Sequence, residues 1–154
     1  MKAFEQFCKA KKKNSDEWIV GYFARAKWFM DEREMFVIFP LDICFFPHSE
    51  VSEYEEIDKE TICRFTGITD KNRKPIFEND IVKHKYTPFG CDESKTKNYV
   101  IKWDSTGAYC GYRYHNGRNI FPFKYGTSWN GNDEVIGNIF DNPELLEGSQ
   151  EGKA

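Results

Sequence analysis

The sequence RFTGITDKNRKPIFENDIV, at residues 64–82, is the stretch around which we expect the chain to fold. It reads as the end of an aromatic strand, a glycine, a polar turn and the start of a second hydrophobic strand. Short polar side chains next to asparagine and proline are typical of turns, because they accept hydrogen bonds from nearby backbone N–H groups. We therefore predict that Asp70 and Asp80 cap two turns and do not form a catalytic carboxylate pair.

Hydrophobic runs of strand length lie on both sides of this stretch. They are rich in aromatic and β-branched residues and are separated by polar residues, which is the pattern of antiparallel strands. Within the first run, Trp18, Val20 and Tyr22 can share one face, and Gly21 indicates a bulge or a close backbone approach. The sequence predicts strands at residues 18–30, 35–40, 81–86, 99–103, 108–115 and 134–140.

The second half of the chain carries clear turn and helix signals. Asn116-Gly117 favours a two-residue hairpin turn, since both residues can take positive φ. Residues 119–129 continue as an aromatic strand or an ordered loop. Residues 142–147 have the layout of a short helix, with Asn142 as N-cap and Pro143 at the first helical position. We expect residues 148–154 to form a flexible tail.

Three other segments are less clear. Residues 3–13 have the spacing of a short amphipathic helix, although a strand ending in a polar turn fits them as well. Residues 41–46 are apolar and bracketed by prolines, which allows a further strand or a sheet edge. Residues 87–98 are rich in turn formers and lysine, so we expect a mobile loop there.

Residues 49–60 (SEVSEYEEIDKE) are acidic. A carboxylate cluster for metal binding or acid–base work would need two inward acids and a partner base. Charge runs usually face solvent, so we favour a solvated strand and turn in which Val51, Tyr54 and Ile57 point inward.

The composition describes a globular protein with 154 residues. A hydrophobic fraction of 40% is compatible with a packed core, and an aromatic fraction of 17% favours β structure. The net charge of −3 gives no overall field that would attract nucleic acid or anionic lipid. No apolar run has the length of a membrane span and no signal peptide is visible, so we expect a cytoplasmic protein that makes no contact with a membrane.

The cysteines and histidines show no metal-ligand spacing. The five cysteines are scattered, no CxxC occurs, and we expect most of the thiols to be small buried side chains. We therefore predict no bound metal and no cofactor. The residues concerned are Cys8, Cys44, Cys63, Cys91 and Cys110, with His48, His84 and His115.

Catalysis is not indicated by any motif. A nucleophilic Cys–His pair could be built from Cys91 or Cys110 with His84 or His115, but nothing nearby activates either thiol. No GxSxG turn, phosphate-binding glycine loop or dinucleotide fingerprint is present. We expect no catalytic residue and keep a cysteine-dependent enzyme as a distant alternative.

Aromatic and basic residues alternate between residues 109 and 129, and no acid interrupts them. Stacking platforms next to cations are what single-stranded nucleic acid requires. The plainer interpretation is that the strand places its aromatic side chains in the core and leaves the cations on an ordinary surface. The candidate nucleic-acid-binding residues are Tyr112, Arg113, Tyr114, His115, Arg118, Lys124 and Trp129.

Three stretches together resemble the YopX family of bacterial phage and prophage proteins. They are RFTGITDKNRKPIFENDIV, the strand YVIKW followed by Asp104, and EVIGNIFDNPELLE near the C-terminus. KAKKKNSDEWIVGYF at the start is similar to that family's charged turn and strand, which favours a strand for residues 4–10. The resemblance implies a β-rich fold, a phage or prophage origin and the cytoplasm of a bacterial host. It implies no activity, cofactor or catalytic residue.

Two residues depart from the family pattern. Arg73 and Asn79 stand where the family usually has glycine, at positions that require positive φ. Asparagine enters the left-handed region at modest cost, whereas arginine does so less readily. Either the first turn changes type in this chain or Arg73 is held under mild strain.

We therefore expect a mainly β protein, built as an antiparallel, partly closed barrel or as packed β-meanders, with one short C-terminal helix. Residues 1–147 form one β-rich domain, in which an N-terminal lobe (1–62) and a core (63–147) could be separated at the acidic segment. The predicted role is that of a phage accessory protein acting by association with a protein partner or with itself. Nucleic-acid binding through residues 109–129 is the alternative.

Overall fold

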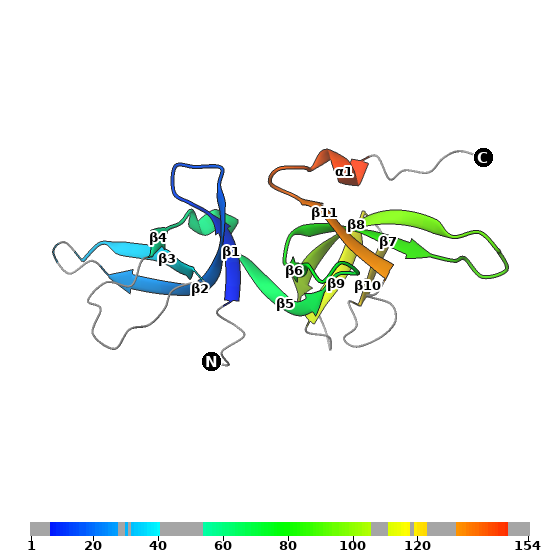
Figure 1. The fold of residues 1–154 in the computed structure, drawn as a ribbon, viewed down its shortest axis with the longest axis horizontal. Helices are drawn as coiled ribbons and strands as arrows, with labels where there is room; N and C mark the ends of the chain where they lie inside the picture. Colours follow the sequence, from blue (N-terminus) through cyan, green and yellow to red (C-terminus); the bar gives the residue numbers. More distant parts are fainter. Residues whose placement is uncertain are drawn as a thin grey trace. The chain divides into compact units, whose positions relative to one another are not determined.

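The computed structural model describes residues 7–27, 30, 32–40, 54–105, 111–117, 119–122 and 132–147. Over these residues the chain is mainly β, with two antiparallel sheets and one short helix, and neither sheet forms a closed barrel (Figure 1). The predicted fold class is confirmed in the form of packed β-meanders. The chain divides into two compact units, residues 1–65 and residues 66–154.

The first unit is a meander that pairs back on its first strand. The strand order is β4-β3-β2-β1-β5, and every pairing is antiparallel. A single turn of 3₁₀-helix, η2 (Lys59–Thr61), precedes β5. The strands are β1 (Phe7–Lys11), β2 (Trp18–Lys27), β3 (Glu34–Pro40), β4 (Glu55–Glu56) and the start of β5 (Cys63–Thr69).

Residues 7–11 are a strand, so helical periodicity was misleading there and the family resemblance was the better guide. Alternation decides the outcome, because Cys8 and Ala10 are buried while their neighbours are only half-buried. Both side chains belong to the core of this unit, with Ile38 and Ile57.

The predicted close backbone approach at Gly21 is confirmed, because β3 passes close to this residue of β2. A Cβ atom at this position would lie 2.0 Å from the carbonyl oxygen of Phe39 and 2.8 Å from Cγ2 of Ile38. The register runs through Gly21 without interruption on both sides, so the residue is not part of a bulge.

The second unit contains the rest of the chain. β5 continues into it and pairs with β6 (Pro75–Phe77), and the following strands form a five-stranded sheet in the order β10-β9-β8-β7-β11. The strands of that sheet are β7 (Asp80–Tyr86), β8 (Lys95–Asp104), β9 (Gly111–Asn116), β10 (Asn119–Pro122) and β11 (Asp133–Asn138). The helix α1 (Glu144–Glu147) follows β11, and Asn98 Nδ2 on β8 donates to the Leu145 carbonyl at 2.8 Å.

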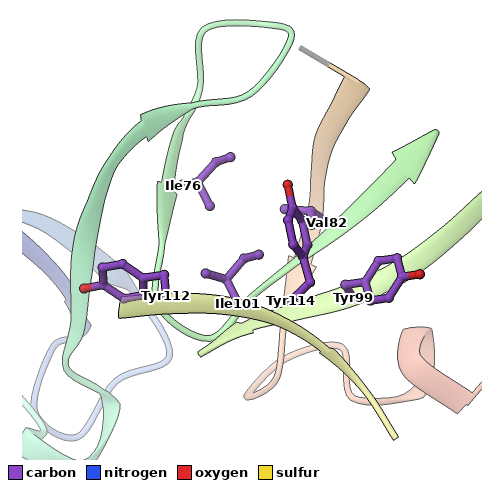
Figure 2. Packing of buried hydrophobic residues seen from close by; sticks show 6 residues of the cluster. All are labelled: Ile76, Val82, Tyr99, Ile101, Tyr112 and Tyr114. Carbon is purple, nitrogen blue, oxygen red and sulfur yellow. The ribbon is translucent and has the colours of Figure 1, made fainter. Parts of the chain in front are cut away.

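The core of the second unit lies between the β5–β6 hairpin and one face of the sheet. Figure 2 shows Ile76 of the hairpin on the same side of the sheet as the side chains of β7, β8 and β9. Tyr99 and Tyr114 meet edge to face with ring centroids 5.6 Å apart, and Tyr112 meets Trp103 at 5.0 Å. The cluster consists of Ile76, Val82, Tyr99, Ile101, Tyr112 and Tyr114.

Four local predictions need correction or qualification. Tyr54 does not point inward, since 42% of its surface is exposed, whereas Ile57 is buried as expected. Asn116 lies in β9 and pairs with Asn119, so it is a strand residue and not a turn residue. The expected loop at 87–98 is shorter, because β8 begins at Lys95, directly opposite Tyr86. The helix begins at Glu144, two residues after the expected N-cap Asn142.

Several predicted elements fall outside the described residues. They are residues 3–6, the apolar segment 41–46 with Val51, the first part of the 108–115 strand, residues 123–129 and the tail 148–154.

Candidate functional site

The turn between β5 and β6 is organised by the carboxylate of Asp70. Asp70 Oδ1 accepts hydrogen bonds from the N–H groups of Asn72 at 2.8 Å and Lys74 at 2.9 Å. The Arg73 N–H donates to the Asp70 carbonyl at 3.0 Å, which closes a four-residue turn, and Arg73 takes a φ of +64°. Three-residue hairpin loops usually consist of a type I turn followed by one left-handed residue. Glycine is the most common residue at that left-handed position. The prediction of a turn cap is confirmed, and Arg73 is the strained position.

The Asp70 carboxylate also contacts β11, which lies much later in the sequence. Asp70 Oδ2 accepts a hydrogen bond from the Val135 N–H at 3.0 Å, and the Lys71 N–H donates to the Asp133 carbonyl at 3.0 Å. One buried side chain therefore joins the β5–β6 turn to β11. This contact explains why the 64–82 stretch and the EVIGNIF stretch belong together in space.

The second turn uses Asp80 in a similar way. Asp80 is 1% exposed, and its Oδ2 accepts a hydrogen bond from the Phe77 N–H at 2.8 Å. Asn79 takes a φ of +67°, its N–H donates to the Ile101 carbonyl at 2.7 Å, and its own carbonyl accepts from the Ile139 N–H at 3.1 Å. Asp70 and Asp80 thus both cap turns.

A buried polar cluster links three strands of the second sheet. Asp133 on β11 is fully buried, with its Oδ1 2.7 Å from His84 Nδ1 on β7 and its Oδ2 accepting the Tyr114 hydroxyl of β9 at 2.5 Å. The His84 ring also packs against Tyr99, with ring centroids 6.2 Å apart, and burial raises the pKa of Tyr99.

A carboxylate that orients an imidazole is an arrangement found in acid–base catalysis. Here His84 is 1% exposed and Tyr114 is 0% exposed, so a substrate has no access to the imidazole. The cluster stabilises the sheet. Sequence reasoning did not identify it, although strand alternation places His84 on the inward face with Val82.

An aromatic row crosses the first sheet. The register places five aromatic side chains opposite one another: four lie on β5, β1, β2 and β3, and the fifth directly precedes β4. Phe7 lies opposite Tyr22, Tyr22 lies opposite Phe39, and continuing the β1–β5 and β3–β4 registers by one residue adds Phe65 and Tyr54. Directly opposite residues share a face, and strands lie about 4.8 Å apart, so the row is about 19 Å long. We call Phe65, Phe7, Tyr22, Phe39 and Tyr54 the aromatic row.

The rings of the aromatic row contact each other edge to face. Phe7 meets Phe65 at a centroid distance of 5.3 Å and an interplanar angle of 90°, and Phe39 meets Tyr54 at 6.4 Å and 62°. Tyr22 and Tyr54 are 48% and 42% exposed, and the three phenylalanines are half-buried. The row is therefore a solvent-accessible apolar strip. Its rings do not present parallel faces on which flat groups could stack one after another.

Cations next to the aromatic row are already engaged. Lys9 Nζ lies 5.0 Å from the ring centroid of Trp18, and Lys11 Nζ lies 5.7 Å from it. Lys11 also forms an ion pair with Asp16 at 3.2 Å. Lys9 and Lys11 therefore form a polar border beside the row, on the same face of β1 as Phe7.

The predicted nucleic-acid-binding residues separate into two groups. Tyr112 and Tyr114 are 6% and 0% exposed, so neither can stack on a base. Arg113 and His115 lie on the other face of β9, and Arg113 Nε is 3.3 Å from Asp104 Oδ2. Arg118, Lys124 and Trp129 lie outside the described residues.

Burial lowers the pKa of His115, and the nearby charge of Lys102 lowers it further. Lys102 stands directly opposite Arg113. In the described part of the 109–129 segment, Tyr112 and Tyr114 are buried, and Arg113 and His115 lie on the opposite face of β9.

The structure describes three of the five cysteines. Cys8 and Cys63 are buried, as expected for packed thiols, and Cys63 Sγ donates to the Thr61 carbonyl at 3.3 Å. Cys91 is exposed in the β7–β8 loop, while Cys44 and Cys110 lie outside the described residues.

Within the described ranges, no group of three or more His, Cys, Asp or Glu side chains is placed to hold a metal ion. In the same part of the chain, no helix has the length and apolar character needed to cross a membrane.

Comparison with known proteins identifies the family of the chain. A comparison with curated proteins found no match. The family model described as YopX protein matches residues 26–147, which includes the 64–82 stretch and the segment from β11 to α1. Because this match extends over most of the sequence, the chain belongs to the YopX family.

Proposed function

We propose that the protein is a phage- or prophage-encoded accessory protein without catalytic activity, which acts in the bacterial cytoplasm by binding another protein or a second copy of itself. The aromatic row is the observation that carries this proposal. Aromatic side chains supply much of the binding energy in protein interfaces, where they are enriched relative to the rest of the surface.

The geometry of the row favours a protein partner over single-stranded nucleic acid. Bases stack in series on exposed ring faces, whereas the neighbouring rings of the row stand at 60° to 90° to each other in the Phe7–Tyr22, Phe7–Phe65 and Phe39–Tyr54 pairs. Such a strip accepts apolar side chains between its rings. The engaged cations Lys9 and Lys11 form a polar rim, as in other protein interfaces.

The absence of catalysis is part of the proposal. Its support is that the one His–Asp pair among the described residues, His84 with Asp133, is closed to solvent. An activity that depends on Cys91, abolished by Cys91→Ser at unchanged stability, would overturn this part.

The experiment is a pull-down from an induced lysogen with three baits, each with and without nuclease. The baits are the wild-type chain, the variant Tyr22→Ser with Tyr54→Ser, and the control Ile120→Ser, which removes a 46%-exposed side chain from the second sheet. We expect the control to retain a partner that the row variant loses, because truncation of an interface aromatic costs about 2 kcal/mol, or roughly thirtyfold in affinity. Sedimentation equilibrium of the same three chains measures self-association.

Equal recovery by all three baits would show that the aromatic row is not the interface. A chain that stays monomeric and recovers nothing would contradict binding as the function. Circular dichroism of the row variant separates lost binding from lost folding, since both substituted tyrosines are exposed.

Nucleic-acid binding through residues 109–129 stays a prediction for Arg113, His115, Arg118, Lys124 and Trp129. The double variant Arg113→Ala with Lys124→Ala should weaken salt-dependent binding to a single-stranded oligonucleotide if that surface is used. Undetectable binding of the wild-type chain at low salt would end this alternative.

A further inference from the structure

The loop between β7 and β8 projects from the second unit. The last pair of these strands is Tyr86 opposite Lys95, so residues 87–94 connect them. Figure 1 shows that the hairpin extends beyond the other strands of its unit. We call residues 87–94 the tip.

The tip has a defined structure. The Cys91 N–H donates to the Pro88 carbonyl at 3.1 Å, and Gly90 takes a φ of +78°, as the third residue of a type II turn requires. The hydroxyls of Thr87 and Ser94 lie 3.3 Å apart across the base of the tip. The turn therefore fixes the side chain at its second position, residue 89.

This turn places Phe89 entirely in solvent. Its exposure is 106% of the reference value, higher than that of any other large hydrophobic side chain among the residues described. An apolar side chain stabilises a protein or a complex when it is removed from water, and the folded chain alone gains nothing from Phe89 in this way. The tip therefore presents an apolar knob that a partner can bury.

The tip is also acidic. Asp92 and Glu93 are exposed, and residues 87–94 contain no lysine or arginine. The nearest cations along the chain, Lys85 and Lys95, belong to the paired strands. No ion pair joins either carboxylate of the tip to another residue in the described part of the chain. The apolar knob thus stands beside two negative charges.

The aromatic row of the first unit has a place for one further ring. Its edge-to-face contacts fall into two groups, with Phe65, Phe7 and Tyr22 in one and Phe39 and Tyr54 in the other. Among the residues described, Tyr22 and Phe39 make no ring contact with each other, although their strands pair them directly. An aromatic side chain that enters between these two rings would complete the edge-to-face series.

The exposed part of the row is small for a broad partner surface. An aromatic side chain buries about 150–250 Å² when it is covered, so these partly exposed rings offer roughly 300–500 Å² together. A standard interface covers about 800 Å² on each partner. The row therefore fits an inserted loop better than it fits the face of a globular domain.

The border of the row has the opposite charge from the tip. Lys9 and Lys11 lie on the same face of β1 as Phe7, and both ammonium groups lie near the Trp18 ring. Lys11 also pairs with Asp16. Alternate residues of a strand are about 7 Å apart, so these ammonium groups lie within reach of an acidic loop that enters the row beside Phe7.

We propose that the occupant of the aromatic row is a second copy of this chain, whose tip inserts Phe89 between Tyr22 and Phe39. This inference rests on the proposed function, because it uses the same row as the interface. The two acids of the tip then face the two lysines beside the row. Complementary charges of this kind steer an encounter and fix its orientation.

The tip and the row are different surfaces, so the contact between two copies is heterologous. Each pair of copies retains one row and one tip for further copies. Such contacts build a ring where the rotation closes and an open chain where it does not. The covered area is below that of stable interfaces, so we expect weak association that rises with protein concentration.

Sedimentation equilibrium of the full chain at concentrations up to millimolar tests the association. The wild-type chain should form species larger than a dimer. Phe89→Ser should weaken association roughly thirtyfold, as truncation of a central interface aromatic does. The control Ile120→Ser removes another exposed apolar side chain and should associate like the wild type. Circular dichroism should show all chains folded, since both substituted side chains are exposed.

A mixture of two variants distinguishes this arrangement from any symmetric one. Phe89→Ser keeps an intact row, and Tyr22→Ser with Tyr54→Ser keeps an intact tip. Each variant alone should stay monomeric, whereas an equal mixture should form dimers and nothing larger, because only one productive contact is possible. An interface that used the same surface on both copies would not be restored by mixing.

The cysteine of the tip allows the contact to be trapped. Cys91 is exposed, and a short cross-linker with one thiol-reactive and one amine-reactive end should join it to Lys9 or Lys11 of another copy. In a mixture of isotope-labelled and unlabelled chains, mass spectrometry should find this cross-link between chains of different label. Phe89→Ser should lose it. The variant Asp92→Asn with Glu93→Gln should weaken association and make it less dependent on salt.

Three results would overturn the inference: a wild-type chain that is monomeric at millimolar concentration, association that Phe89→Ser does not change, or a mixture of the two variants that stays monomeric. A cross-link found only within single chains would do the same. If the chain is monomeric but the lysogen pull-down still yields a partner that the row variant loses, the proposed function stands and only the identity of the partner is wrong.

Discussion

Replacing Arg73 by glycine should stabilise the protein. Arg73 is exposed and holds a φ of +64°, and a left-handed conformation costs an L-residue about 1–2 kcal/mol. Glycine removes that cost. It also makes the unfolded chain more flexible, which lowers the free energy of unfolding by about 0.4–1 kcal/mol. We expect a net gain of about 0.5–1 kcal/mol in the free energy of unfolding, which corresponds to roughly 2–8 °C in Tm for a unit of this size.

The assay is urea unfolding followed by circular dichroism, with the midpoints compared at equal m values. Lys74→Gly is the matched control, because Lys74 is the next residue, is also exposed and has no positive φ. The control should lose about 0.5–1 kcal/mol, since only the unfolded state benefits from its glycine. Asn79→Gly should gain less than Arg73→Gly, because asparagine tolerates the left-handed region. Stability of Arg73→Gly at or below the wild-type value would refute the strain argument.

Three further outcomes follow from the contacts described above. Gly21→Ala should unfold the first unit in a thermal melt, because the new Cβ would lie 2.0 Å from the backbone oxygen of Phe39, which cannot yield as a side chain can. Tyr114→Phe should cost about 1 kcal/mol in urea unfolding, whereas Asp133→Ala, which leaves two buried donors without their acceptor, should cost about 2–5 kcal/mol. The pKa of His115 lies below its ordinary value of 6.5. Neutral His115 therefore stabilises the fold fully above pH 6.5, and this contribution declines as the pH falls through the folded-state pKa. NMR titration should show the low pKa, and His115→Asn should flatten the pH dependence of the free energy of unfolding in that range.

Much of the architecture could be predicted from local pattern. Runs of aromatic and β-branched residues identified most strands, and Asp70 and Asp80 could be read as caps because turn chemistry involves only a few neighbouring residues. The errors lie where a local pattern was ambiguous. Residues 7–11 satisfy both helical and strand periodicity, and tertiary packing of Cys8 and Ala10 decides between them.

The candidate surfaces could not be predicted in the same way. The aromatic row combines residues from five strands, and its members share a face only once the pairing register of every strand is known. His84 and Asp133 are 49 positions apart, and β11 joins the sheet beside β7 instead of beside its sequence neighbour β10. Residues 95–98 were assigned to a loop because lysine and asparagine are weak strand signals, although these residues pair with β7.

The position of β11 late in the sequence has a consequence during synthesis, because its contacts with Asp70, His84 and Tyr114 all form after those residues have been made. The ribosome releases β7, β8 and β9 before β11, so His84 and Tyr114 are made before the carboxylate of Asp133 that joins them. Until β11 emerges, the sheet edge formed by β7 is open to any other strand. A premature stop codon just upstream of Asp133 would therefore remove β11 and leave β7 as an unpaired edge of the second sheet.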